Sequence, residues 1–149
     1  HFSMIEKVVG NNYTNEPMAF LLEDSEIQEE IEPYIMARIV DFEEFIRQYP
    51  FDIISIHDDL HFIIEDPIME CNCGDFSLRW DAAGNTILER GGTRGETVRC
   101  DIQTLTAMFY GYKRPTYLKR VERLQANDTA VRILEDIIPI EQPYFSDYF

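Results

Sequence analysis

Apolar residues recur at two different spacings along the chain, and each spacing predicts a different kind of element. Between Asp41, which can cap a helix, and Pro50, which ends one, they fall three or four residues apart. This spacing predicts a short helix. Its apolar positions are Phe42, Phe45, Ile46 and Tyr49.

Runs of β-branched and aromatic residues between turn-forming residues predict strands. The predicted strands are residues 18–22, 34–40, 52–56, 60–66, 74–81, 85–91 and 96–102. The last three are joined by Ala-Ala-Gly-Asn (82–85) and Gly-Gly-Thr-Arg-Gly (91–95), which both suit tight turns. They therefore predict an antiparallel meander.

The last third of the chain returns to helical spacing. Helices are predicted over residues 102–112, 116–124 and 128–138, the last of them capped by Asp128. Pro139 and Pro143 then predict an extended tail. The complete pattern is typical of an α+β fold in which a sheet packs against helices.

The start of the chain is separated from this pattern by an acidic stretch. Residues 1–10 are typical of the end of a helix, and the acidic residues 23–33 follow the first predicted strand. We place a domain boundary in this stretch. Residues 1–32 then form one part with its linker, and residues 33–149 form the second domain.

Charge restricts the possible partners. Thirteen Lys and Arg against 28 Asp and Glu give a formal net charge of −15. Nucleic acids and anionic membranes attract clustered basic residues, so we expect neither as a partner. A cationic partner is compatible with the charge, and so is an acidic surface that only keeps the protein in solution. The sequence shows no apolar run of bilayer length and no signal peptide, so we expect a cytoplasmic protein.

Three groups of residues carry candidate chemistry. Cys-Asn-Cys-Gly (71–74) is either part of a metal or redox site or a tight loop before a strand. His57, Asp59 and His61 would share one face of a strand as an acid–base or metal cluster, or form a polar hairpin tip. The basic residues of 111–115 could hold an anion, or complement the negative end of the helix that they follow.

Two further features need interpretation. Arg-Gly-Gly-Thr-Arg-Gly-Glu (90–96) lies between two strands, so it is typical of a hairpin loop rather than a phosphate-binding loop. The chain ends Pro-Tyr-Phe-Ser-Asp-Tyr-Phe (143–149), and terminal aromatic rings either enter another surface or seal the domain's own core. In a docked tail the carboxylate of Phe149, with an ordinary pKa of about 3.5, would gain basicity from partial burial.

Five segments, in order, resemble the C-terminal part of the Eis-like acetyltransferases of the GNAT superfamily. They are NYTNEPMAFLLEDSEI, YIMARIVDFEEFIRQYPF, FIIEDPIMECNCGDFSL, CDIQTLTAMFYGYKRPTYL and IPIEQPYFSDYF. The resemblance implies that residues 1–32 end a GNAT-type domain and that residues 33–149 form a sterol carrier protein-like domain with a mostly antiparallel sheet. Many members carry Trp-Asn-x-Gly at residues 71–74, and we interpret the difference as a packing change in the same loop.

The resemblance also assigns roles to the tail. In the family the tail enters the active site of the first GNAT-type domain, where the terminal carboxylate, here that of Phe149, helps to deprotonate the attacking amine. Tyr148 and Asp147 would line the amine pocket, although some members have an acidic residue at the penultimate position. The implied co-substrate is acetyl-CoA, the implied substrate is a small cationic amine such as a polyamine or an aminoglycoside, and homo-oligomers are expected.

Acetyl transfer needs the thioester held beside the amine. In the family the pyrophosphate loop for acetyl-CoA and the tyrosine general acid belong to the first GNAT-type domain. We therefore expect these 149 residues to bind no acetyl-CoA and to be inactive without the N-terminal GNAT-type domains. The alternative is a free-standing sterol carrier-like module that binds an apolar ligand in a cavity lined by aromatic residues.

Overall fold

A computed structural model describes residues 28, 30, 36–52, 58–141 and 143. The chain divides into two compact units, residues 1–36 and 37–149, and every element below belongs to the second. The helix end predicted in residues 1–10 and the strand at 18–22 lie outside the described residues, as does nearly all of the strand at 52–56. The assignment of residues 1–32 to a GNAT-type domain therefore stays a prediction.

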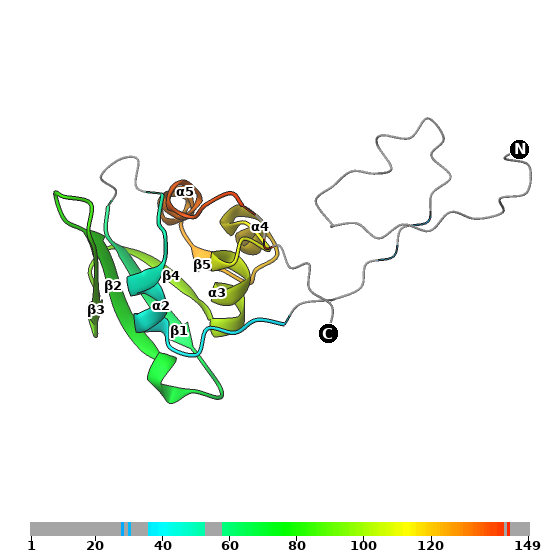
Figure 1. Ribbon diagram of the computed structural model, residues 1–149, viewed down its shortest axis with the longest axis horizontal. Helices are drawn as coiled ribbons and strands as arrows, with labels where there is room; N and C mark the ends of the chain where they lie inside the picture. The colour runs from blue at the N-terminus through cyan, green and yellow to red at the C-terminus, as the bar shows by residue number, and fades with distance from the viewer. Residues whose placement is uncertain (1–27, 29, 31–35, 53–57, 142, 144–149) are drawn as a thin grey trace, which may run out of the picture. The chain divides into compact units, whose positions relative to one another are not determined.

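One five-stranded sheet, in the order β3-β2-β1-β4-β5, forms the centre of this unit (Figure 1). Its strands are β1 (Leu60–Glu65), β2 (Gly74–Trp80), β3 (Thr86–Arg90), β4 (Glu96–Asp101) and β5 (Gln125–Ala126). All neighbouring pairs are antiparallel except β1 and β4, which run parallel. The expected α+β fold with a mostly antiparallel sheet is confirmed.

The predicted three-strand meander is wrong. β2 and β3 form the expected hairpin, in which Trp80 lies opposite Thr86, but β4 pairs with β1 instead of β3. The link at 91–95 is therefore not a hairpin loop. It crosses β2, where the backbone N–H of Arg94 donates to Ser77 Oγ at 2.8 Å. Turn-forming residues mark a change of direction, but they do not specify which strand pairs next.

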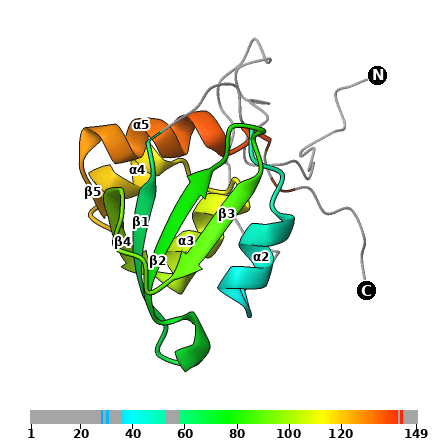
Figure 2. The same cartoon turned by 90° about the vertical axis from the view of Figure 1, so that its left-hand side faces the viewer.

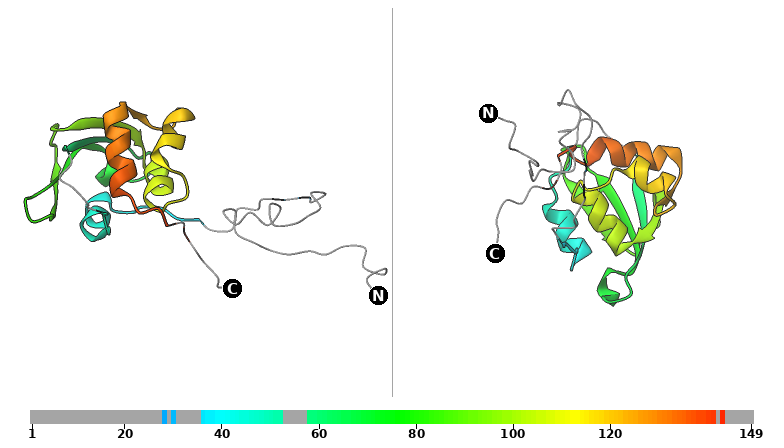
Figure 3. Two further views of the ribbon diagram at one scale, coloured as in Figure 1. Left: turned by 90° about the horizontal axis from the view of Figure 1, so that it is seen from above. Right: turned by 90° about the vertical axis from the view of Figure 1, so that its right-hand side faces the viewer.

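Four α-helices and one 3-10 turn complete the described unit. The helices are α2 (Phe42–Gln48), α3 (Ile102–Phe109), α4 (Pro115–Arg120) and α5 (Asp128–Ile137), and the turn η1 is Glu70–Asn72. The helices lie on one face of the sheet (Figures 2 and 3). None of the helices within the described ranges has the length and apolar character needed to cross a membrane.

The helix caps follow the sequence closely. Asp41 caps α2 by accepting a hydrogen bond from the Glu44 N–H at 3.0 Å, and Asp101 caps α3 by accepting one from the Thr104 N–H at 2.7 Å. The predicted cap Asp128 is wrong by one residue. Asn127 caps α5, and Asp128 is its first helical residue. An Asn and an Asp in sequence can each cap a helix, so side-chain chemistry does not choose between them.

The strand predicted at 34–40 is also wrong over its described residues, 36–40, which form no strand. Ile39 is nevertheless buried in the core, and its backbone N–H donates to Thr106 Oγ1 at 3.2 Å. Apolar residues in this segment therefore bury a side chain against α3 without joining the sheet.

Aromatic rings fill the layer between the sheet and α2. Phe42 packs edge-on against Phe62 of β1 and Phe76 of β2, with ring centroids 5.8 and 5.1 Å apart. All three rings are buried. Alternate positions of β1 and β2 face this layer, so the apolar face of the sheet and the helices share one core.

Candidate functional site at the base of the C-terminal tail

The tail residues given roles by the resemblance, Asp147, Tyr148 and Phe149, lie outside the described part of the chain. Their roles stay predictions. The structure describes the base of the tail, residues 139–141 and 143, and the elements that hold it. The candidate site is therefore built from this base.

The turn between α3 and α4 reaches the base of the tail. Gly111 follows the end of α3 with a φ of 73°, a conformation that side chains disfavour, and Pro115 starts α4 at its first helical position. Between them the backbone of Arg114 is extended, with φ −73° and ψ 151°. This local sequence brings the Arg114 guanidinium to the end of α5.

Arg114 bonds Glu135 in the last turn of α5 and the carbonyls of the two residues that follow the helix. Its Nε donates to Glu135 Oε2 at 2.7 Å, and its Nη2 donates to the Glu135 carbonyl oxygen at 2.8 Å. Its Nη1 donates to the carbonyl oxygens of Ile138 and Pro139, both at 3.0 Å. These carbonyls would otherwise be left without helical partners. The contacts orient the chain where it leaves the domain.

These bonds correct one expectation. The sequence suggested that the basic residues of 111–115 complement the helix that precedes them, but Arg114 pairs with the end of a later helix, α5. Lys113 lies over the rings of Tyr112 and Tyr117, at 4.4 and 5.3 Å from their centroids. Arg114 thus has a structural role, but with a different helix from the one that the sequence suggested.

Glu135 keeps its charge in this arrangement. Burial raises the pKa of its carboxyl group, but hydrogen bonds from Thr116 and the adjacent Arg114 outweigh this effect and hold the pKa below its ordinary value. The Thr116 backbone N–H donates to Glu135 Oε1 at 2.8 Å. The ion pair with Arg114 is therefore intact at neutral pH.

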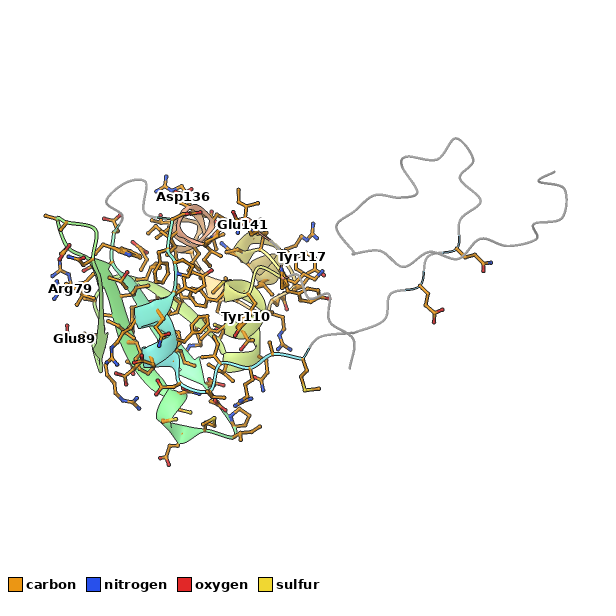
Figure 4. The ribbon with its side chains drawn as sticks, in the orientation of Figure 1. Arg79, Glu89, Tyr110, Tyr117, Asp136 and Glu141 are labelled. Carbon is orange, nitrogen blue, oxygen red and sulfur yellow. The ribbon has the colours of Figure 1, made fainter. Side chains whose placement is uncertain are left out.

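A cleft of about 500 Å³ lies between the ends of α2 and α3 and the base of the tail. We call it the tail-base cleft. Its lining residues are Tyr49, Pro50, Asp52, Phe109, Tyr110, Pro139, Glu141 and Pro143. Figure 4 labels two of them, Tyr110 after α3 and Glu141 in the tail. Aromatic rings, prolines and two carboxylates thus border one space. Sequence reasoning missed this site because no local motif joins residues so distant in the chain.

Tyr49 forms the inner wall of the cleft. Its hydroxyl donates to the Phe109 carbonyl oxygen at 2.8 Å, which ties the end of α2 to the end of α3. Burial raises the pKa of Tyr49 to about 12, Arg114 acts against this rise, and Asp52 and Glu141 add to it. The two carboxylates therefore act electrostatically on the same hydroxyl group.

Asn72 is the central residue of the Cys-Asn-Cys-Gly loop. Its Oδ1 accepts a hydrogen bond from the Phe42 backbone N–H at 2.9 Å, and its Nδ2 donates to Asp66 Oδ2 at 2.9 Å. The loop thereby connects the start of α2 to the end of β1. Asn72 and Gly74 are the two positions that match Trp-Asn-x-Gly, and these contacts favour the interpretation of this loop as packing.

Asp66 is a buried charge with several partners. Its side chain is 0% exposed, and its Oδ1 lies 2.5 Å from Arg38 Nη2. Burial raises its pKa, but hydrogen bonds from Asn72, from the backbone of Ile68 and Met69, and from Arg38 hold the pKa well below its usual range. The carboxylate therefore anchors the segment before α2 to the loop after β1.

The three cysteines are free thiols in different environments. Cys71 is exposed, while Cys73 Sγ contacts the backbone nitrogen and oxygen of Asp66, both at 3.2 Å. Burial raises the pKa of Cys100, Asp101 adds to the rise, and Arg123 opposes it. The Cys100 thiol is thus protonated and a poor nucleophile. Across the described ranges, no three His, Cys, Asp or Glu side chains form a group that could hold a metal ion.

The second candidate cluster is divided between two partners. His61 Nε2 lies 2.7 Å from Asp75 Oδ1 on the neighbouring strand, and Asp59 Oδ2 lies 2.6 Å from Arg94 Nε. His57 lies outside the described residues. His61 therefore connects β1 to β2, and Asp59, just before β1, connects to the loop that crosses the sheet.

The chain matches one known protein family and resembles several solved structures. The family described as the sterol carrier protein domain matches residues 42–146. A crystal structure of a conserved protein of unknown function from Enterococcus faecalis V583, a probable N-acyltransferase, is 30% identical, with a TM-score of 0.76. The match covers 92% of this chain and 34% of that protein, so the chain spans about a third of its length.

Two further solved structures are similar. A GCN5-related N-acetyltransferase from Anabaena variabilis is 27% identical over 71% of this chain and 26% of that protein, with a TM-score of 0.62. One from Kribbella flavida is 24% identical over 75% of this chain and 28% of that protein, with a TM-score of 0.61, and supports the fold alone. No match was found among curated proteins.

Proposed function

Because the chain belongs to the sterol carrier protein domain family, we propose that it is the C-terminal accessory domain of an Eis-like N-acetyltransferase. The observation that carries this proposal is the 30% identity to a probable N-acyltransferase, which extends over 92% of this chain but only 34% of that protein. A domain that aligns almost completely within a larger N-acyltransferase-like protein is best explained as part of such an enzyme.

In this proposal the domain holds and directs the tail. Arg114 bonds Glu135 and the first carbonyls of the tail, so the last residues leave from a fixed point. The complete enzyme would bind acetyl-CoA in its N-terminal GNAT-type domains and receive the tail in its active site. The aromatic side chains of Tyr148 and Phe149 would seat the tail there.

The proposed chemistry uses the terminal carboxylate of Phe149 as a base. The carboxylate accepts a proton from the substrate ammonium group, and the free amine then attacks the acetyl carbon of the thioester. The carbon–sulfur bond breaks, an amide forms, and the second proton of the amine leaves with the thiol of CoA. A general base of this kind contributes about 10²–10⁴ in rate. The substrate would be a small cationic amine of the polyamine or aminoglycoside class.

The experiment extends the tail of the complete enzyme by two residues, Gly-Ser, after Phe149. The carboxylate then remains but is displaced, and we expect kcat to fall about 100-fold. The matched control inserts the same two residues at Gly84, in the exposed turn between β2 and β3, and should leave kcat within about twofold. Undiminished turnover in the tail-extended enzyme would refute the role of the carboxylate.

A simpler measurement tests whether the native protein is a longer enzyme that contains this domain. The mass of the native protein, detected in its source cells with an antibody against this domain, should be several times that of the 149-residue chain. A native product of about the size of this chain would contradict the N-acetyltransferase proposal.

A further inference from the structure

We propose that the tail-base cleft binds an organic ammonium ion between the ring of Tyr110 and the carboxylates of Asp52 and Glu141. The binding requires only residues of this domain. It is therefore independent of the proposed N-acetyltransferase function.

The aromatic wall of the cleft includes a partly exposed ring, that of Tyr110. Tyr110 is 43% exposed, and its ring stacks on Phe45 with centroids 5.8 Å apart and an interplanar angle of 24°. Among the described rings, Phe45 stacks on one face of the Tyr110 ring, and Tyr110 also lines the cleft. Cations bind to the faces of aromatic rings because the ring quadrupole places negative potential there.

The polar wall of the cleft is acidic. Asp52 follows α2, Glu141 lies in the tail, both side chains are exposed, and both line the cleft. Both also raise the pKa of Tyr49, so the negative charges of both act on the Tyr49 hydroxyl group. The two carboxylates can therefore attract a cation that rests against the aromatic wall.

The neighbouring positive charge is already neutralised. Arg114 also acts on Tyr49 and lowers its pKa, but its guanidinium is bonded to Glu135 and to the carbonyls of Ile138 and Pro139. Asp52 and Glu141 have no such ion pair among the described residues, so the cleft keeps an excess of negative charge. The formal net charge of −15 adds long-range attraction for cations.

The chemistry of the cleft distinguishes an organic cation from other ligands. A bare metal ion would need more oxygen ligands than two carboxylates supply, and among the described residues no three acidic, His or Cys side chains form a group that could hold one. A purely apolar ligand would remove water from two carboxylates without compensating their charge. An ammonium group with methyl or methylene substituents can contact the faces of the aromatic rings through its substituents, and can pair its charge with the carboxylates.

The test is an NMR titration of the complete chain with choline and, in parallel, with its neutral isostere 3,3-dimethylbutan-1-ol. The two compounds have the same shape and differ in charge. We expect choline to shift backbone amide signals around Tyr49, Tyr110 and Glu141 to saturation, and the alcohol to bind at least about fivefold more weakly. Added salt should weaken the binding of choline but not that of the alcohol.

Paired variants locate the site. Tyr110→Leu and Glu141→Gln should each weaken choline binding about fivefold. The matched controls are Tyr117→Leu, which removes an exposed tyrosine of α4, and Asp136→Asn, which removes an exposed carboxylate of α5; all four positions are labelled in Figure 4. Both controls should leave choline affinity within about twofold. Unchanged far-UV circular dichroism shows that each variant is folded.

Three results would overturn the proposal. The first is equal affinity for the alcohol and choline, which would make the cleft an apolar groove. The second is the absence of saturable choline binding. The third is an equal loss of choline affinity in the cleft variants and the control variants. None of these results bears on the tail-extension experiment, which measures turnover of the complete enzyme. The two proposals can therefore fail separately.

Discussion

Arg114 and Glu135 form an ion pair between the turn before α4 and the last turn of α5, with Arg114 Nε and Nη2 lying 2.7 and 2.6 Å from Glu135 Oε2. The same guanidinium bonds the carbonyl oxygens of Ile138 and Pro139. One side chain thus packs two helices together and holds the first residues of the tail. Lys has neither the planar fork nor the number of donors to make all of these bonds.

Replacement of Arg114 by Lys should therefore destabilise the domain while its charge is kept. We expect the free energy of unfolding to fall by about 1–3 kcal/mol because partly buried carbonyls lose their donors. The measurement is urea denaturation. The matched control, Arg132→Lys, changes an exposed arginine of α5 with no ion pair among the described residues, and should change the free energy by less than about 0.5 kcal/mol. Equal effects at the two positions would contradict the proposed role of Arg114.

Asp66 predicts a pH dependence of stability. Its pKa in the folded state lies below its unfolded value of about 3.9. The folded state therefore binds this proton less readily than the unfolded state, and the stabilisation is complete above about pH 4 and is lost as the pH falls further. Asp66→Asn should lower the free energy of unfolding by about 2–4 kcal/mol at pH 7.

The measurement is urea denaturation from pH 7 to pH 2.5. It gives the difference in the free energy of unfolding between the natural protein and the Asp66→Asn variant at each pH. This difference should shrink below about pH 4. Asp136→Asn, which removes an exposed carboxylate of α5, controls for the loss of one negative charge. A difference for Asp66→Asn that is constant over the whole range would show that the carboxylate contributes no pH-dependent stability.

Asn72 and Asn85 provide a matched comparison of buried and exposed amides. Each donates its side-chain N–H to an aspartate: Asn72 to Asp66 at 2.9 Å in the core, and Asn85 to Asp81 at 2.8 Å in an exposed turn. Asn72→Asp would place two carboxylates together without water, and we expect a loss of about 2–4 kcal/mol in unfolding free energy. Asn85→Asp should cost less than about 1 kcal/mol. Similar losses in thermal or urea unfolding would refute the proposed importance of burial at Asn72.

Alanine substitutions at Gly95 and Gly84 distinguish the cost of backbone strain from the cost of a steric clash. Both have positive φ values, 111° and 83°, so alanine is strained at either position. At Gly95 an added Cβ would also lie 2.2 Å from the Asp59 carbonyl oxygen, whereas the space around Gly84 is open. We expect Gly84→Ala to cost about 1 kcal/mol and Gly95→Ala at least about 2 kcal/mol more, measured by urea denaturation. Equal costs would mean that the crossing loop moves freely away from β1.

The sequence by itself predicted the features that depend on neighbours along the chain. Asp41 caps α2 because its side-chain oxygen reaches an amide three residues later, and this geometry is local. The strands at 60–65, 74–80, 86–90 and 96–101 follow from runs of residues with high strand propensity. The α+β class follows from the order of these elements.

Only the tertiary structure decided which distant groups meet. β4 pairs with β1 because the loop at 91–95 crosses the sheet, and no turn motif encodes that partner. Arg114 bonds the end of α5, and Tyr110 and Glu141 border one cleft, although nothing in their local sequences connects them. Local propensities act over a few residues, whereas these contacts depend on the packing of the whole core. The chemistry of the tail base is therefore a property of the fold.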